Sequence, residues 1–131
     1  MKLIEFTIYG NPPSKSNGYK IITLPSVFAG KRPRSSLAKT AKLKAYERDF
    51  FSQITGAQRL GLECKITAIL RVYNDSWRPD LDGSFKVIFD CLQRGGVIKN
   101  DRQIKRIVAE QFKDAQNPRV EIELHEYAPT L

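Results

Sequence analysis

The chain has 131 residues, 41% of them hydrophobic and 27% charged, which is the size and composition of one folded domain rather than of a disordered segment. Its 22 Lys and Arg against 14 Asp and Glu give a formal charge of +8, a balance typical of proteins that bind nucleic acid. No stretch approaches the roughly 18 apolar residues of a membrane span. Glu5 interrupts the apolar N-terminus, which excludes a signal peptide. We therefore expect a single cytoplasmic domain over residues 1–131 with no membrane partner.

Alternating hydrophobicity predicts a first strand over residues 4–8, ended by a cluster of turn-forming residues at 10–14. Residues 14–34 are expected to form a long loop, because turn formers recur along them: Gly18, Pro25, Gly30 and Pro33. Ser35 is expected to cap a helix that runs to about Thr55. The buried stripe of this helix is predicted from apolar residues spaced three to four apart: Leu43, Tyr46, Phe50 and Ile54.

Further elements follow in the second half of the chain. A strand is predicted over residues 64–73, and a second helix runs from near Asp80 to Gly95-Gly96, where glycine can take the left-handed conformation that ends helices. Residues 104–112 and 120–124 are predicted as two more strands. The order β-α-β-α-β-β indicates an α/β or α+β fold, with a mixed sheet and two main helices.

Few side chains in this sequence can perform soft-metal or nucleophilic chemistry. Cys64 and Cys91 lie far apart with no C-x-x-C pair, and His125 is the single histidine. Together they exclude a zinc site of the Cys/His type, and any Ser-His or Cys-His pair would depend on His125.

Carboxylates are concentrated where the second predicted helix begins. Asp80 and Asp82 flank one apolar residue, so both side chains can face the same point. Lys86 follows Asp82 by four residues and so shares its helical face. Asp101, in the turn after this helix, is expected to return to the same end of the sheet.

Three carboxylates that converge on one point repel one another unless a cation lies between them. Oxygen ligands without histidine or thiol suit Mg²⁺, with Mn²⁺ as a substitute. Such a metal activates water and stabilises the charge that builds on a phosphodiester during cleavage, and Lys86 would add a fixed positive charge. The competing interpretation is structural, because Asp commonly caps helices and an Asp–Lys pair four residues apart is a common surface ion pair.

Positive charge is concentrated in residues 15–48, which contain nine Lys and Arg and only one acidic residue, Glu47. This run is expected to follow the phosphates of DNA. The residues predicted to bind DNA are Lys15, Lys20, Lys31, Arg32, Arg34, Lys39, Lys44, Arg48 and, beside the acidic segment, Arg78. Tyr19 and Phe28 either stack on bases or pack into the core, and Trp77 either packs beside the acidic segment or faces DNA.

In their order and spacing, these motifs resemble the RusA family of Holliday-junction resolvases over nearly the whole chain. The sequence Asn11-Pro12-Pro13-Ser14-Lys15-Ser16-Asn17 resembles the family's P-P-S-x-N opening. Asp80-Leu81-Asp82 with Lys86 resembles its central D-L-D-N-x-x-K signature. Residues 95–104 resemble the G-x-x-x-D-D-x-Q-[IV] run that follows. Gly83 stands where the family usually has Asn, and Asn100 replaces the first acid of the D-D pair.

The resemblance implies a homodimeric, Mg²⁺-dependent endonuclease that resolves four-way DNA junctions by paired symmetric nicks and needs no organic cofactor. By position, Asp80, Asp82 and Asp101 would be catalytic carboxylates that hold the metal, and Lys86 would be the catalytic lysine. It also implies a role in recombination or repair at the nucleoid, often in a phage or prophage setting.

Other functional classes fit the sequence less well. A non-catalytic protein that binds DNA junctions is the main alternative. A nuclease of the PD-(D/E)xK type is excluded because the only acid-x-Lys tripeptide, Glu63-Cys64-Lys65, lies upstream of Asp80. An RNA-binding module would need an aromatic sheet signature that the sequence lacks.

Overall fold

Four strands with alternating buried side chains form the main sheet in the computed structural model, which describes residues 1–14, 18–24 and 34–129. Their order across the sheet is β1 (Lys2–Tyr9), β6 (Arg119–Glu126), β4 (Ile66–Asn74) and β5 (Ile104–Lys113). β4 and β5 are parallel, whereas β6 is antiparallel to both β1 and β4. The fold is therefore α+β with a mixed sheet and two helices, which confirms the predicted fold class.

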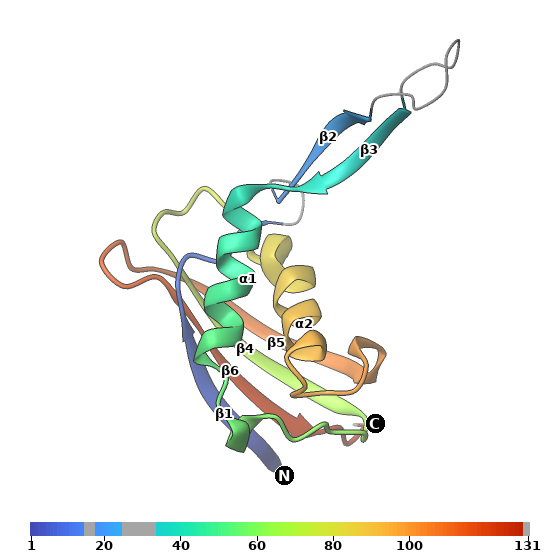
Figure 1. Cartoon of the computed structure of the whole chain (residues 1–131). Helices are drawn as coiled ribbons and strands as arrows, with labels where there is room; N and C mark the ends of the chain where they lie inside the picture. The colour runs from blue at the N-terminus through green and yellow to red at the C-terminus, as the bar shows by residue number, and fades with distance from the viewer. Residues whose placement is uncertain (15–17, 25–33, 130–131) are drawn as a thin grey trace.

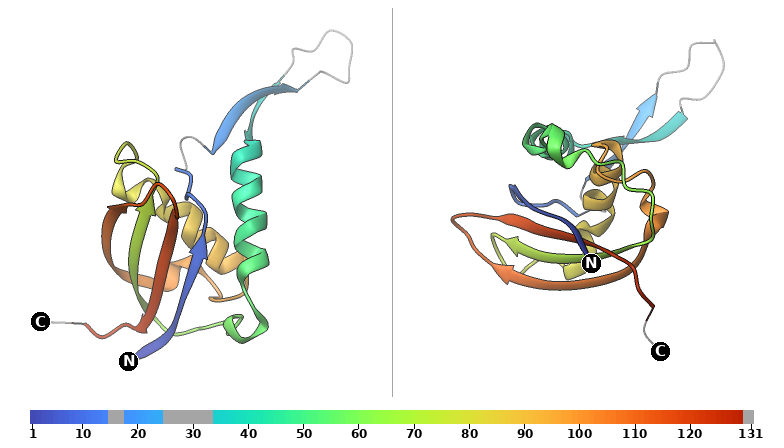
Figure 2. Two further views of the ribbon diagram at one scale, coloured as in Figure 1. Left: turned by 90° about the vertical axis from the view of Figure 1, so that its left-hand side faces the viewer. Right: turned by 90° about the horizontal axis from the view of Figure 1, so that it is seen from below.

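The two helices, α1 (Ala41–Gln53) and α2 (Phe85–Arg94), cover the same face of this sheet (Figures 1 and 2). The predicted stripe on α1 is confirmed, since Leu43, Tyr46, Phe50 and Ile54 are all buried. They pack in one core with α2 residues such as Ile88 and Leu92, and with the inner face of the sheet. Gly96 has φ +83°, the left-handed conformation expected after α2. No helix within the described ranges is long and apolar enough to cross a membrane.

The prediction of a loop over residues 14–34 is wrong for the described part of that segment. Residues Tyr19–Leu24 form β2 and Arg34–Lys39 form β3, an antiparallel hairpin that projects from the body beyond the start of α1 (Figure 1). The observed order is thus β-β-β-α-β-α-β-β rather than β-α-β-α-β-β. The sequence Tyr-Lys-Ile-Ile-Thr-Leu of β2 is rich in β-branched residues, a strand signal that the neighbouring Gly and Pro outweighed.

The predicted helix cap at Ser35 is also wrong. Ser35 pairs with Thr23 across the hairpin, so its backbone belongs to the β ladder. Thr40 caps α1 instead, and its hydroxyl accepts a hydrogen bond from the Leu43 N–H at 3.2 Å. The Thr40 N–H donates to the Gly18 carbonyl at 2.9 Å, which joins the helix start to the base of the hairpin.

Candidate active site and DNA-binding surface

The predicted pair Asp80 and Asp82 lies on one short turn between β4 and α2. This turn is η2 (Leu81–Ser84), a 3₁₀ helix with Asp80 as its extended N-cap residue. The Asp80 side chain makes no capping hydrogen bond, although capping is the common role of Asp at this position. Both side chains are exposed, and within the described part of the chain neither carboxylate has an ion-pair or hydrogen-bond partner. The structural interpretation of Asp80 as a helix cap is therefore not supported.

Backbone and side-chain contacts hold this turn in place. Asn74, at the end of β4, is only 2% exposed. The Gln111 side-chain amide on β5 donates to Asn74 Oδ1 at 3.0 Å and to the Pro79 carbonyl at 2.8 Å. Gln111 thus fixes the residue before Asp80 to the sheet. Sequence reasoning missed this residue because the parallel pairing of β4 with β5 leaves no local signal.

Lys86, on the first turn of α2, forms an ion pair with Asp101 at 2.8 Å. Asp101 begins the short helix η3 (Asp101–Gln103), and its N–H donates to the Gln93 side chain at 2.9 Å. The hydrogen bond from Lys86 to Asp101 raises the pKa of the lysine above its usual range. Lys86 therefore stays protonated at neutral pH and carries a positive charge beside Asp101.

The expectation that Asp101 returns to the same end of the sheet as Asp80 is wrong. Asp80 follows the C-terminal end of β4, whereas Asp101 precedes the N-terminal end of β5, and these two strands are parallel. The ten residues of α2, about 15 Å of helix, connect these two ends of the sheet. Lys86 bridges part of this separation by extending its long side chain toward Asp101. Among the residues that the structure describes, no three His, Cys, Asp or Glu side chains lie close enough to hold a metal ion.

The Asp80–Asp82 turn nevertheless has the donor chemistry that a magnesium site needs. Mg²⁺ commonly uses one or two protein carboxylates and completes its coordination with water and substrate phosphate. Asp80 and Asp82 supply two carboxylates on one exposed turn, with no partner in the part of the chain that the structure describes. The Asp101 carboxylate, in contrast, is engaged by Lys86. The residues present thus fit a metal held by the turn, with Asp101 acting on Lys86.

Both departures from the family pattern have a local structural role. Asn100 caps η3, since its side chain accepts from the Arg102 N–H at 2.9 Å while its own N–H donates to Gln103 at 2.7 Å. At Gly83, a Cβ atom would lie 3.3 Å from the Ser14 Cβ, a tighter contact than side chains normally make. Glycine therefore lets the segment after β1 pack closely against the acidic turn.

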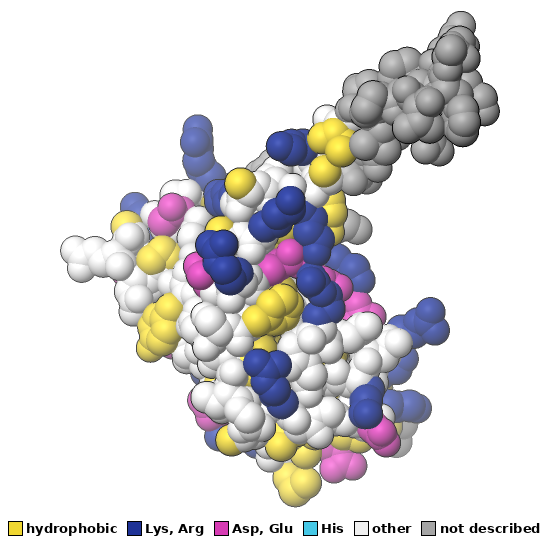
Figure 3. Space-filling model, in the orientation of Figure 1, with side chains coloured by type: hydrophobic (Ala, Val, Ile, Leu, Met, Phe, Trp, Pro, Cys, Tyr) yellow, Lys and Arg dark blue, Asp and Glu magenta, His cyan; other side chains and the backbone are white. Residues whose placement is uncertain are grey.

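The predicted DNA-binding cations lie mainly on the hairpin and α1, and Figure 3 shows many Lys and Arg side chains on this helical face. Four of them are exposed: Lys20 on β2, Lys44 and Arg48 on α1, and Arg78 before η2. Lys39 differs, because it is paired with Glu47 at 2.8 Å. Lys15, Lys31 and Arg32 lie outside the described residues, as does Phe28, while Arg34 is described only as part of β3.

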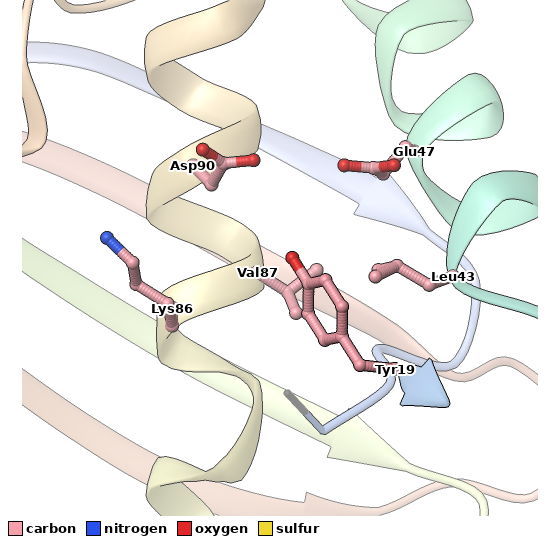
Figure 4. Close-up of a pocket in the computed structure, with 6 residues that line it drawn as sticks. All are labelled: Tyr19, Leu43, Glu47, Lys86, Val87 and Asp90. Carbon is pink, nitrogen blue, oxygen red and sulfur yellow. The ribbon is translucent and has the colours of Figure 1, made fainter. Parts of the chain in front are cut away.

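The sequence left open whether the aromatic residues near these cations face DNA or the core. Tyr19 packs against the core, and Trp77 is 62% exposed on the loop before Asp80. Figure 4 shows Tyr19 between the two helices, beside a cavity of about 110 Å³ lined by Tyr19, Leu43, Glu47, Lys86, Val87 and Asp90. Tyr19 therefore seats the base of the hairpin between α1 and α2.

Reactive thiols do not contribute to this site. Burial raises the pKa of Cys91 to about 12, so its thiol stays protonated. Cys64 is partly buried against the core. This agrees with a site whose chemistry is carried by oxygen and ammonium groups.

Fold and charge together describe a small, basic α+β protein, and a positive charge of this size is typical of proteins that bind nucleic acid. Residues 28–125, about three quarters of the chain, match the family described as endodeoxyribonuclease RusA. The chain belongs to this family, which confirms the resemblance seen in the sequence motifs. This membership supports the general part of the predicted function, which is that of a junction-resolving endonuclease. No curated protein matches the chain.

Proposed function

We propose that this protein is a Mg²⁺-dependent endonuclease that resolves four-way DNA junctions by paired symmetric nicks. The observation that carries the proposal is the Asp80–Asp82 turn, where two exposed carboxylates with no partner among the described residues lie in a strongly basic chain. Unpartnered acids on a DNA-binding protein repel phosphate unless a cation neutralises them. Family membership supports the same reaction class.

Asp80 and Asp82 would hold Mg²⁺, with Mn²⁺ as a substitute. When bound, the metal supplies an activated water and charge stabilisation at the phosphodiester. Lys86, kept protonated by Asp101, stabilises the negative charge that develops on the phosphate or on the leaving oxygen. In this assignment Asp101 orients Lys86, and it reaches the metal only if the 2.8 Å ion pair opens.

DNA would lie along the hairpin and the exposed face of α1. Lys20, Lys44 and Arg48 are exposed there, and Arg78 continues the positive surface to the acidic turn. Lys15, Lys31, Arg32 and Arg34, the other cations predicted from the sequence, would also contact phosphate. Phosphate contacts of this kind give affinity that falls steeply with salt.

A homodimer matches the proposed substrate, because a four-way junction has a near two-fold axis and two identical sites produce symmetric nicks. Such a protein would act in the cytoplasm, at the nucleoid, in recombination or repair, with a phage or prophage origin as part of the proposal. The alternative function is junction binding without catalysis. Exposed cations on the hairpin and α1 favour DNA binding in either case.

A cleavage assay on a synthetic four-way junction separates these two functions. The protein is incubated with the junction in Mg²⁺, in Mn²⁺ and in EDTA, and each strand is labelled in turn. Paired nicks at symmetric positions in Mg²⁺ but not in EDTA are expected. Tight binding without nicks in either metal would establish the non-catalytic function instead.

A further inference from the structure

A second cavity, of about 260 Å³, lies directly beside the acidic turn. One wall is the segment after β1, residues 11–14. The other walls are Lys42 at the start of α1, residues 78–80 and Gly83. At about 30 Å³ per water molecule, the cavity is far larger than a site for one ordered water and has room for a phosphate with part of its sugar.

The lining of this cavity is positively charged. Lys42 and Arg78 both line it, and Asp80 is the only acid among its described lining residues. Both basic side chains are exposed, and neither has an ion-pair partner within the described ranges of the chain. Two free cations beside one carboxylate suit an anion that is shared with a metal held by that carboxylate.

The walls are held in place before any ligand binds. The Asn11 side chain accepts a hydrogen bond from the Asp75 N–H at 3.2 Å, and the Gly10 N–H donates to the Pro118 carbonyl at 2.9 Å. Gln111 holds Pro79 from the opposite side at 2.8 Å. A preformed site loses little conformational entropy on binding, which favours a specific ligand over an incidental surface contact.

We propose that this cavity binds one DNA phosphodiester next to the one that is cut, with Lys42 and Arg78 as its ligands. The inference rests on the proposed function for its position relative to the cut. It adds Lys42, which belongs to the basic run of residues 15–48 but is not among the individual residues predicted to bind DNA. Holding the neighbouring phosphate would fix the register of the strand over Asp80 and Asp82. The site would thus position the substrate rather than contribute to affinity alone.

The first test compares Lys42→Gln with the wild-type protein and with Lys65→Gln. Lys65 is also exposed but precedes β4, whose nine residues place it about 30 Å from the cavity end of that strand. Junction affinity is measured in EDTA by fluorescence anisotropy from about 50 to about 200 mM salt. Losing one phosphate contact lowers the slope of log affinity against log salt concentration by about 0.9. Over this salt range, the affinity of Lys42→Gln should therefore fall about threefold less than that of the wild-type protein, whereas Lys65→Gln should behave like the wild-type protein. Equal slopes for both variants and the wild-type protein would overturn the proposal.

The second test locates the phosphate. Single neutral methylphosphonate linkages are placed in turn at each position around the crossover of the junction. In the wild-type protein, a neutral linkage at one position should lower affinity through the loss of both the Lys42 and the Arg78 contacts. Lys42→Gln should lose less affinity at that position alone, because only Arg78 still contacts the phosphate. Identical responses of both proteins at every position would show that the cavity holds no phosphate.

Nicking by the wild-type protein in Mg²⁺, measured in parallel, keeps the two proposals distinguishable. If the protein nicks the junction but Lys42→Gln responds like the wild-type protein at every methylphosphonate position, the phosphate-binding role of the cavity is refuted and the proposed function stands. A protein that does not nick but shows such a position refutes catalysis and retains the cavity as a DNA-phosphate site. A wild-type protein that does not bind the junction refutes both.

Discussion

Two groups of carboxylates near α2 differ in how their charge is balanced. Glu47, on α1, is only 7% exposed, and its carboxylate pairs with Lys39 of the hairpin at 2.8 Å and with Arg94 of α2. Arg94 also lies over the Phe51 ring, 5.2 Å from its centroid. Asp80 and Asp82, at the other end of α2, are exposed and have no partner in the described part of the chain.

This difference separates the structural role of Glu47 from the functional role proposed for Asp80 and Asp82. A buried carboxylate must be paired, because an uncompensated charge in the interior is strongly unfavourable. Glu47 therefore joins three elements, the hairpin, α1 and α2. An exposed carboxylate can remain unpaired at little cost, which leaves Asp80 and Asp82 free to bind a ligand. The same distinction applies to the cations, since Lys39 is engaged by Glu47, whereas Lys20 has no ion-pair partner within the described ranges.

The largest expected effect is at the unpartnered pair. Asp82→Asn should lower the nicking rate by about a thousandfold, because a metal ligand is lost. Junction binding should be retained or strengthened, since a negative charge near phosphate is removed, and the free energy of unfolding should change by less than about 0.5 kcal/mol. The comparison is Asp49→Asn, an exposed residue on α1 that should nick normally. Normal nicking by Asp82→Asn would show that this turn holds no catalytic metal.

The buried carboxylate should behave in the opposite way. Glu47→Gln leaves Lys39 and Arg94 without their shared anion, and we expect the free energy of unfolding to fall by about 1–3 kcal/mol. The lower part of this range reflects the partial exposure of both cations. Urea unfolding followed by circular dichroism measures the change. Glu110→Gln, an exposed residue of β5, is the control and should change stability by less than about 0.5 kcal/mol; an equal loss in both variants would contradict the structural role of Glu47.

A third group of carboxylates, on the uncovered face of the sheet, should make stability depend on pH. Hydrogen bonds from Arg71 and Arg119 hold the pKa of Glu121 below its usual range, and hydrogen bonds from His125 and Arg71 do the same for Glu123. A lowered pKa in the folded state adds stability that is present above the pKa of the unfolded chain, about 4.5, and is lost as the pH falls through the folded values.

Urea unfolding from pH 6 to pH 3 tests this pH dependence. Arg71→Gln should be about 1 kcal/mol less stable than the wild-type protein above pH 5, and the difference should shrink as the pH falls below about 4. A difference that stays constant over this range would mean that Arg71 acts through packing and not through these two carboxylates.

The smallest expected effect compares two lysines of the same hairpin. Lys20→Gln should leave stability unchanged and lower the salt slope of junction binding by about 0.9, because its exposed charge is free to contact phosphate. Lys39→Gln should mainly reduce stability, because its charge is engaged by Glu47. Anisotropy over a salt series and urea unfolding of both variants measure the two effects. A larger slope change for Lys39→Gln than for Lys20→Gln would reverse the assignment.

By itself, the sequence determined the regular parts of the molecule and the family. The stripe from Leu43 to Ile54 and the alternation along β4 and β6 depend on local periodicity, so they could be predicted within a few residues. The Asp80–Asp82 pair was recognisable because only one residue separates its two acids in the sequence. The motif order from residue 11 to residue 104 indicated the RusA family before the fold was known.

Only the tertiary structure decided which of these residues meet. The β2–β3 hairpin is stabilised by pairing between segments ten or more residues apart, and its Gly and Pro neighbours hid the strand signal. The parallel pairing of β4 with β5 places Asp80 and Asp101 at opposite ends of α2, and Asp101 forms an ion pair with Lys86 instead. Packing of α1 against α2 and the hairpin buries Glu47 among cations. Such contacts depend on the path of the whole chain, and no local pattern specifies them.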